Sequence, residues 1–219
     1  MTEQHNHQGK AERIALAMQG GGAVGAFQAG VLEALHEANV EVDACCGASG
    51  SLPPWFAPIE IGGAWYWDGS LSSAAPLHHI VETAPADVQT TILRADLWSP
   101  DGQVPDNLSD AEIRQKNIEH GSRAAAYHEA LNESQRLRSL LAYALNCIEP
   151  ARRQSDPQLM NPAALATARP IRVVPIDYES SQRGLHFKDG QFSPAAIETH
   201  WAHGREAAKA ALERMHAED

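Results

Sequence analysis

The sequence predicts an α/β fold, a three-layer sandwich in which a central, largely parallel sheet lies between helices. Three observations predict it. Residues 13–18 form an apolar run that stops at Gly20-Gly21-Gly22, as a buried parallel strand does when it ends in a turn. A helical pattern over 23–38 and an apolar run over 40–46 complete a strand–helix–strand unit, which is right-handed by strong precedent. Two more core strands are predicted at 88–98 and 171–177.

The elements of the first half are predicted by spacing and by turn residues. The first helix carries one apolar stripe at spacings of three and four, made by Val24, Phe27, Val31, Leu32 and Leu35. Further on, Gly62-Gly63 between two β-prone runs predicts a hairpin. Residues 76–83 predict a short helix.

The second half begins with a long helical region. Ser109 followed by Glu112 matches a capping box, so we expect helix, with interruptions, from about 109 to 149. The prolines between 150 and 170 predict a loop. Ser193-Pro194 then predicts the start of a final helix, with serine at the cap and proline in the first turn.

The totals indicate one globular domain. A chain of 219 residues with 43% hydrophobic residues suits a single domain over 12–219, preceded by a polar, disordered terminus over 1–11. Asp and Glu outnumber Lys and Arg by 28 to 17, for a net charge of -11. Because phosphate backbones would be repelled, nucleic acid is excluded as an expected partner.

The cysteines and the amino-terminal residues predict a cytoplasmic location. Cys45, Cys46 and Cys147 are an odd number of cysteines that includes two neighbours in an apolar run, which suits buried thiols in a reducing compartment. The first 13 residues are polar and lack the apolar core of a signal peptide, and no run approaches the roughly 18 apolar residues of a membrane span.

The first motif with chemical meaning is the run Gly20 to Gly25, spaced G-x-G-x-x-G between a strand and a helix. Such a loop points free backbone N–H groups at one spot. One fitting ligand is a dinucleotide pyrophosphate, with Glu41 or Asp43 as the ribose-binding acid. The other is the oxyanion formed when a serine attacks an ester. A tight turn without a ligand is the third interpretation.

Two further motifs favour the ester. Gly47-Ala48-Ser49-Gly50 follows a predicted strand and has the small neighbours of a nucleophile elbow, although Ser51 stands at the closing position of G-x-S-x-G. Asp68 in Trp67-Asp68-Gly69 follows an aromatic run and is a candidate general base for Ser49. An ordinary serine turn and an Asp-Gly turn are the alternatives.

Together the three motifs resemble the patatin-like phospholipase family. The segment MQGGGAVGAFQAGVLEAL is similar to its glycine loop, and ASGSLPPWFAPIEIGGAWYWDGSLSSAAPL is similar to the segment around its aspartate. RADLWSPDG and Thr199-His200-Trp201 are similar to later parts of one bacterial branch. The resemblance implies a serine esterase or lipase that needs no metal and no cofactor. It implies the following roles: nucleophile Ser49, base Asp68, oxyanion hole Gly20, Gly21, Gly22 and Ala23, and supporting glycines Gly25, Gly47, Gly50 and Gly69.

The chain departs from the family pattern in one respect. Family members carry a long helical stretch between the elbow and the aspartate, whereas Ser49 and Asp68 are 19 residues apart here. Apolar surface left uncovered by the missing stretch predicts a homo-oligomer, with a dimer favoured. The alternatives are a relative that binds lipid without catalysis and, less favoured, a nucleotide-binding module.

Other side chains extend these expectations. His78 and His79 could rebuild a Ser-His-Asp triad or could simply lie on a surface helix. Trp55, Phe56 and the run 65–67 form the densest aromatic patch, which suits the core, a subunit contact or an acyl-chain groove. The expected substrate is a lipid or short-chain ester, which allows peripheral contact with a membrane.

Overall fold

The structure is a computed structural model, and it describes residues 12–47, 57–67, 77–85, 88–159, 170–178 and 188–218. The predicted disordered terminus, 1–11, lies outside the described residues. In chain order the elements are β1 (Glu12–Met18), the 3-10 turn η1 (Gly22–Gly25), α1 (Ala26–Glu37), β2 (Ala44–Gly47), β3 (Ile59–Ile61), β4 (Ala64–Tyr66), α2 (Leu77–Glu82), β5 (Gln89–Asp96), α3 (Leu108–Asn146), α4 (Pro150–Ser155), β6 (Ile171–Asp177), the 3-10 turn η3 (Lys188–Gly190) and α6 (Pro194–Glu218).

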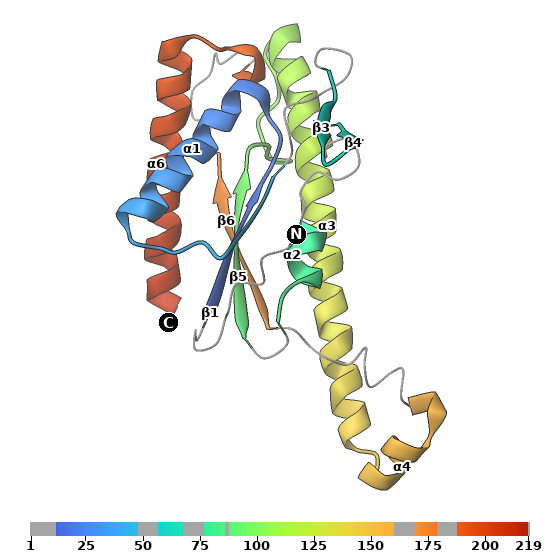
Figure 1. The fold of residues 1–219 in the computed structure, drawn as a ribbon. Coiled ribbons are helices and arrows are strands. Elements are labelled where there is room, and N and C mark those ends of the chain that lie inside the picture. Colours follow the sequence, from blue (N-terminus) through green and yellow to red (C-terminus); the bar gives the residue numbers. More distant parts are fainter. Residues whose placement is uncertain are drawn as a thin grey trace.

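The sheet is parallel and lies between helices, as the sequence predicts. Its strand order is β2-β1-β5-β6, and each neighbouring pair is parallel. Figure 1 shows α1 and α6 on one side of the sheet and α2 and α3 on the other. The larger core cluster joins α1 and α6 to the sheet through Phe27, Val31, Leu93 and Ile176, among others. The smaller cluster joins α2 to the opposite face. The three-layer α/β fold is therefore confirmed.

Two glycines bring the helices of the first layer into close contact. A Cβ atom on Gly30 would clash with the carbonyl oxygen of Trp201, and one on Gly204 would clash with that of Phe27. The backbones of α1 and α6 therefore touch where they cross, which draws both helices onto the same face of the sheet.

Several predicted boundaries change. Strand β2 begins at Ala44 instead of Val40, because the helix ends in a left-handed turn at Asn39, with φ 55°, and Val40 N still bonds to Leu35 O at 2.9 Å. Helix α3 is capped by Asn107 rather than Ser109, since the Asn107 side chain accepts from Asp110 N and donates to the Asp110 carboxylate. The helix is continuous to Asn146, without the predicted interruptions.

In the second half of the chain, one segment differs from its prediction and another agrees with it. The predicted loop after residue 150 begins with a helix, α4, because Pro150 occupies the first turn, where its missing N–H costs nothing. The final helix begins at Pro194 as predicted, and Ser193 Oγ accepts from Ala196 N at 3.3 Å.

The expectation of buried thiols is wrong. Cys45 and Cys147 are exposed and Cys46 is half-buried, and all three are free. Strand β2 lies at the edge of the sheet, where the helices cover less of the sheet surface than at β1. Cys45 is therefore exposed, whereas Leu16, its partner in register on β1, is fully buried.

Candidate active site

The glycine loop lies at the carboxyl end of β1 and has a conformation that requires glycine at position 22. Gly22 has φ +56°, in the left-handed region. A Cβ atom there would also clash with the backbone oxygen of Asp189 in η3. Two independent constraints therefore exclude a side chain at this position.

Two side chains orient the peptide groups of this loop. Gln28 Nε2 donates to Gln19 O at 2.6 Å, and Trp98 Nε1 donates to Gly20 O at 3.0 Å. In a trans peptide the C=O and the N–H point in opposite directions. The N–H groups of Gly20 and Gly21 therefore point away from Gln28 and Trp98. Among the described residues, nothing accepts a hydrogen bond from the N–H groups of Gly20, Gly21 or Gly22.

Residues of the loop after β5 form hydrogen bonds with the beginning of the glycine loop and with the residue before it. Gln19 is 3% exposed, and its Oε1 accepts from Leu97 N at 2.8 Å. The next residue, Trp98, is 5% exposed and makes the bond to Gly20. None of the three sequence motifs includes Gln19, Gln28 or Trp98. The signal that could have found them is the position of Gln19 next to the glycines and of Trp98 just past a strand end.

Helix α3 and turn η3 also contact the glycine loop or the residues that bond to it. Lys116 Nζ lies 2.6 Å from Asp189 Oδ2, with both side chains partly exposed. The His120 ring packs on Trp98 with ring centroids 5.3 Å apart, and burial lowers the pKa of His120. Two elements far along the chain therefore meet at the glycine loop.

Strand register places the approach to the predicted elbow at the same edge. Gly47, the last residue of β2, pairs with Met18, the last residue of β1. A Cβ atom on Gly47 would lie 3.3 Å from Met18 Cε, so a larger residue would press on that side chain. The structure thus brings Gly47 beside the predicted oxyanion hole, Gly20 to Ala23. Ser49, Gly50, Asp68 and Gly69 lie outside the described residues.

Gly25 is under less constraint than its place in the motif implies. Its φ and ψ are -54° and -22°, and nothing described lies within 4 Å of an added Cβ. The described surroundings therefore do not require a glycine at position 25.

The two histidines lie on the surface helix α2. His78 Nε2 is 3.1 Å from Glu82 Oε1, with side chains 70% and 61% exposed, and His79 is also exposed. Both are thus open to solvent, and the triad hypothesis stays a prediction because Ser49 and Asp68 are not described.

The two acidic residues of the nucleotide-binding interpretation lie at the end of the sheet away from the glycine loop. Glu41 and Asp43 precede β2 and so lie at the amino end of the sheet, whereas the glycine loop follows the carboxyl end of β1. The Asp43 carboxylate accepts from Ile14 N at 2.9 Å, at the beginning of β1. A ribose-binding acid belongs at the carboxyl end of the second strand. The expectation that either residue serves this role is therefore wrong.

A pair of acids that the sequence analysis did not single out lies at the carboxyl edge. Asp96 and Asp177 face each other in register at the ends of β5 and β6. Arg94 Nε donates to Asp96 Oδ2 at 2.6 Å, and Asp96 is only 6% exposed. Burial raises the pKa of Asp96 to about 6, against the lowering effect of Arg94 and with a smaller raising effect of Asp177. A buried carboxyl group with a raised pKa therefore lies just before Leu97 and Trp98.

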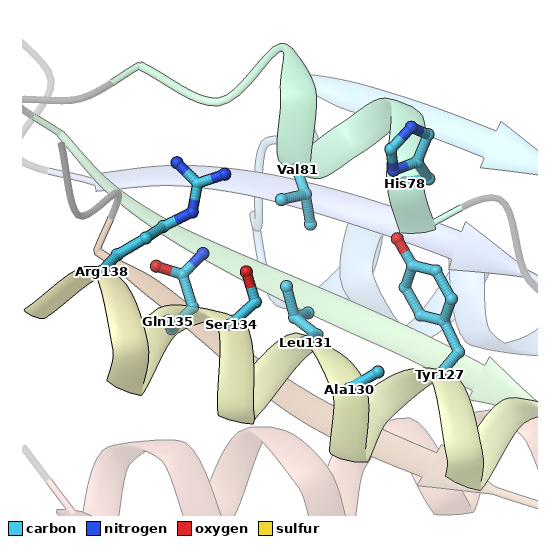
Figure 2. A pocket seen from close by; sticks show the side chains of 8 residues that line it. All are labelled: His78, Val81, Tyr127, Ala130, Leu131, Ser134, Gln135 and Arg138. Atoms are coloured by element: carbon cyan, nitrogen blue, oxygen red, sulfur yellow. The ribbon is translucent and has the colours of Figure 1, made fainter. Parts of the chain in front are cut away.

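A cavity of about 270 Å³ lies elsewhere, between α2 and α3. Figure 2 shows the hydroxyl of Tyr127 directed toward His78 at one end and Arg138 at the other, with Val81 and Leu131 between them. None of the glycine-loop residues lines it. The cavity is therefore separate from the predicted oxyanion hole.

Membrane spans and metal sites are two further features that the described residues could contain. Among the helices that the structure describes, none combines the length and hydrophobicity that a membrane span requires. In the same residues, His, Cys, Asp and Glu nowhere gather in a group of three or more suited to a metal ion.

Comparison with known families agrees with the resemblance seen in the sequence. A family model described as patatin-like phospholipase matches residues 16–50, which contain the glycine loop and Ser49. A second, described as patatin phospholipase, matches residues 118–219, which contain β6 and α6. No curated protein matches the chain significantly. Both models describe phospholipases, which suggests hydrolysis of lipid esters. The two matches, to separate stretches of the chain, support a patatin-like family for this protein.

Proposed function

We propose that this protein is a serine esterase that hydrolyses carboxylic esters of lipids through Ser49 and Asp68, with an oxyanion hole at Gly20 to Ala23. The observation that supports it best is the glycine loop, whose N–H groups are turned away from Gln28 and Trp98 and have no acceptor among the described residues. Preorganised donors of this kind usually make the largest single contribution to stabilising a developing oxyanion.

Chain connectivity supports the choice of nucleophile. Gly47 ends β2 in register with Met18, and Ser49 is two residues further on. Two residues span at most about 7 Å. This short separation from Gly47 favours Ser49 as the nucleophile over serines further along the chain.

The proposed reaction has two steps. Asp68 accepts the Ser49 proton as the serine oxygen attacks the ester carbonyl, and the N–H groups of the loop donate to the oxyanion. The protonated Asp68 then gives this proton to the leaving oxygen, so that the alcohol departs, the acyl group stays on Ser49 and Asp68 is again a carboxylate. Water activated by the same carboxylate then releases the acid. The expected substrates are lipid esters and short p-nitrophenyl esters, and the expected location is the cytoplasm, which cell fractionation would test.

The decisive experiment is labelling with a fluorophosphonate, followed by mass spectrometry of the modified peptide. We expect the label on Ser49, and loss of both labelling and p-nitrophenyl ester turnover in Ser49→Ala. Asp68→Asn should abolish turnover as well. Ser139→Ala is the matched control, because Ser139 is an exposed serine on α3 whose hydroxyl bonds only locally, to Gln135 O.

Other outcomes would support a different function. A label on another serine would move the nucleophile and contradict the dyad. Lipid binding with neither labelling nor turnover would support the alternative, a family member that has lost catalysis.

A further inference from the structure

The hairpin β3–β4 exposes a group of large apolar side chains. Its two strands pair with each other and with no other described strand. Five large side chains on or next to it are 44% to 64% exposed, namely Ile59, Ile61, Trp65, Tyr66 and Trp67. An isolated two-stranded hairpin is marginally stable in water, and large exposed apolar patches mark interaction sites. The hairpin therefore needs a partner surface.

Its register separates these side chains into two chemically different faces. Gly62 and Gly63 have φ +59° and +82°, which forms the two-residue turn predicted from the sequence. Ile59 pairs with Tyr66 and Ile61 with Ala64, so one face is apolar. Glu60 pairs with Trp65, so the other face carries a carboxylate beside an indole ring. Strand alternation puts Trp67 on the same face as Trp65.

Glu60 and Trp65 are in the position where cross-strand side chains lie closest. In an antiparallel pair, hydrogen-bonded and non-hydrogen-bonded positions alternate. Ile61 and Ala64 close the two-residue turn and form a hydrogen-bonded pair, so Glu60 and Trp65 form a non-hydrogen-bonded one. Cβ atoms at such positions are about 4.5 Å apart. A ligand group can thus contact the carboxylate and the indole at once.

This combination fits a quaternary ammonium group. Indole faces attract cations, most effectively weakly hydrated ones such as choline, and a carboxylate adds full charge complementarity. The described residues 57–67 contain no Lys or Arg, and the chain carries a net charge of -11. Anionic lipid surfaces would therefore be repelled.

We propose that the hairpin β3–β4 docks on choline-headgroup lipids through the face of Glu60 and Trp65, with these two side chains on the trimethylammonium group and Trp67 beside them at the lipid interface. Trp and Tyr rings suit this depth of a lipid surface, because they are apolar and also carry a polar group.

A second copy of the chain fits the face of Glu60 and Trp65 less well. Self-pairing through the Glu60 face would bring two carboxylates into one desolvated contact, and like charges in such a contact repel. A zwitterionic lipid surface instead offers a cation to every Glu60. Charge complementarity therefore favours the lipid as the occupant.

The hairpin is also connected to the proposed chemistry. Trp67 directly precedes Asp68, the proposed base. Figure 1 shows the hairpin in the upper half of the view, where the strands of the sheet end. The docking itself is independent of catalysis, but the conclusion that choline lipids are the substrate class rests on the proposed function.

Flotation of the full chain with vesicles tests the proposal, using the Ser49→Ala variant so that no lipid is consumed. We expect binding to phosphatidylcholine vesicles at least tenfold tighter than to phosphatidylglycerol vesicles, and tighter than to phosphatidylethanolamine vesicles. Adding Trp65→Ala should weaken phosphatidylcholine binding at least tenfold. Adding Glu60→Gln should also weaken phosphatidylcholine binding, because the trimethylammonium group then loses its charge partner.

Two variants separate docking from folding. Trp65→Phe keeps an aromatic ring and should retain most of the binding, whereas Tyr143→Ala removes a 72% exposed ring on α3 and should leave binding unchanged. Equal binding to phosphatidylcholine and phosphatidylglycerol, or unchanged binding by Trp65→Ala, would overturn the proposal. So would a dimer that dissociates in Trp65→Ala, because the hairpin would then serve a second copy. Vesicle binding without serine labelling would keep the docking surface and remove only the proposed function.

Discussion

Trp98 donates its indole N–H to the carbonyl oxygen of Gly20 at 3.0 Å, although 78 residues separate the two. This bond fixes the direction of the following N–H, that of Gly21, which belongs to the proposed oxyanion hole. The most specific support for the glycine loop therefore comes from the segment after β5 and not from the motif itself.

Trp98→Phe should impair catalysis more than substrate binding. The ring stays, but Gly20 O loses its donor and the peptide group can rotate. Because misplacement by about 1 Å costs about a hundredfold in rate, we expect kcat for p-nitrophenyl esters to fall at least tenfold with little change in KM. Trp201→Phe is the matched control, since its indole N–H bonds to Glu33 on the outer side of α1 and α6. An equal loss in both variants would contradict the assigned role of Trp98.

Gly22→Ala should disrupt the loop. The left-handed φ and the clash with Asp189 O both oppose a methyl group, so we expect a loss of about 1–3 kcal/mol in unfolding free energy, at the scale typical of strained backbone positions, and loss of esterase activity. The measurements are urea denaturation and steady-state kinetics. Gly25→Ala, with helical dihedrals and open space around the added methyl, should keep the stability of the native chain. Equal destabilisation by the two substitutions would contradict the conclusion that position 22 requires glycine and position 25 does not.

Asp96 should make the stability of the fold depend on pH in an unusual direction. Its pKa is raised in the folded state, from 3.8 to about 6, so the folded chain binds the proton more tightly than the unfolded chain. The stabilisation is complete below about pH 4 and is lost as the pH rises to about 6. Relative to Asp96→Asn, we expect the native chain to lose about 2–3 kcal/mol between pH 4 and pH 7.

Urea denaturation of both proteins across this pH range measures the difference. Asp101→Asn is a suitable control, because Asp101 is exposed on the loop after β5. Parallel stability curves for the native chain and Asp96→Asn would contradict the assignment of the raised pKa to Asp96.

The predicted dimer has a candidate surface on α3. Leu137 and Leu140, one turn apart, are 56% and 55% exposed, and Figure 1 shows that this half of α3 extends beyond the sheet toward α4. We expect the native chain to sediment as a dimer and the double variant Leu137→Asp, Leu140→Asp to sediment as a monomer with unchanged circular dichroism. Val104→Asp, at an 87% exposed position before α3, should leave the dimer intact. A monodisperse monomer for the native chain would end this prediction.

The sequence by itself determined the elements whose signals are local. The apolar run before Gly20, the spacing of Val24, Phe27 and Val31, the Gly62-Gly63 turn and the Ser193-Pro194 start all predict structure correctly, because hydrophobic period and turn chemistry act over a few residues. The family resemblance arises from the same short segments, and the comparisons agree with it.

Only the tertiary structure decided which residues support the site. Strand order places β2 at the edge and exposes Cys45, and register places Asp43 at the end of the sheet away from the glycine loop. The contacts of Trp98 with Gly20 and of Asp189 with Lys116 join positions 73 or more residues apart. Spacing along the chain carries no information about such contacts, because they form only when packing of the helices on the sheet brings separate strand ends to one edge.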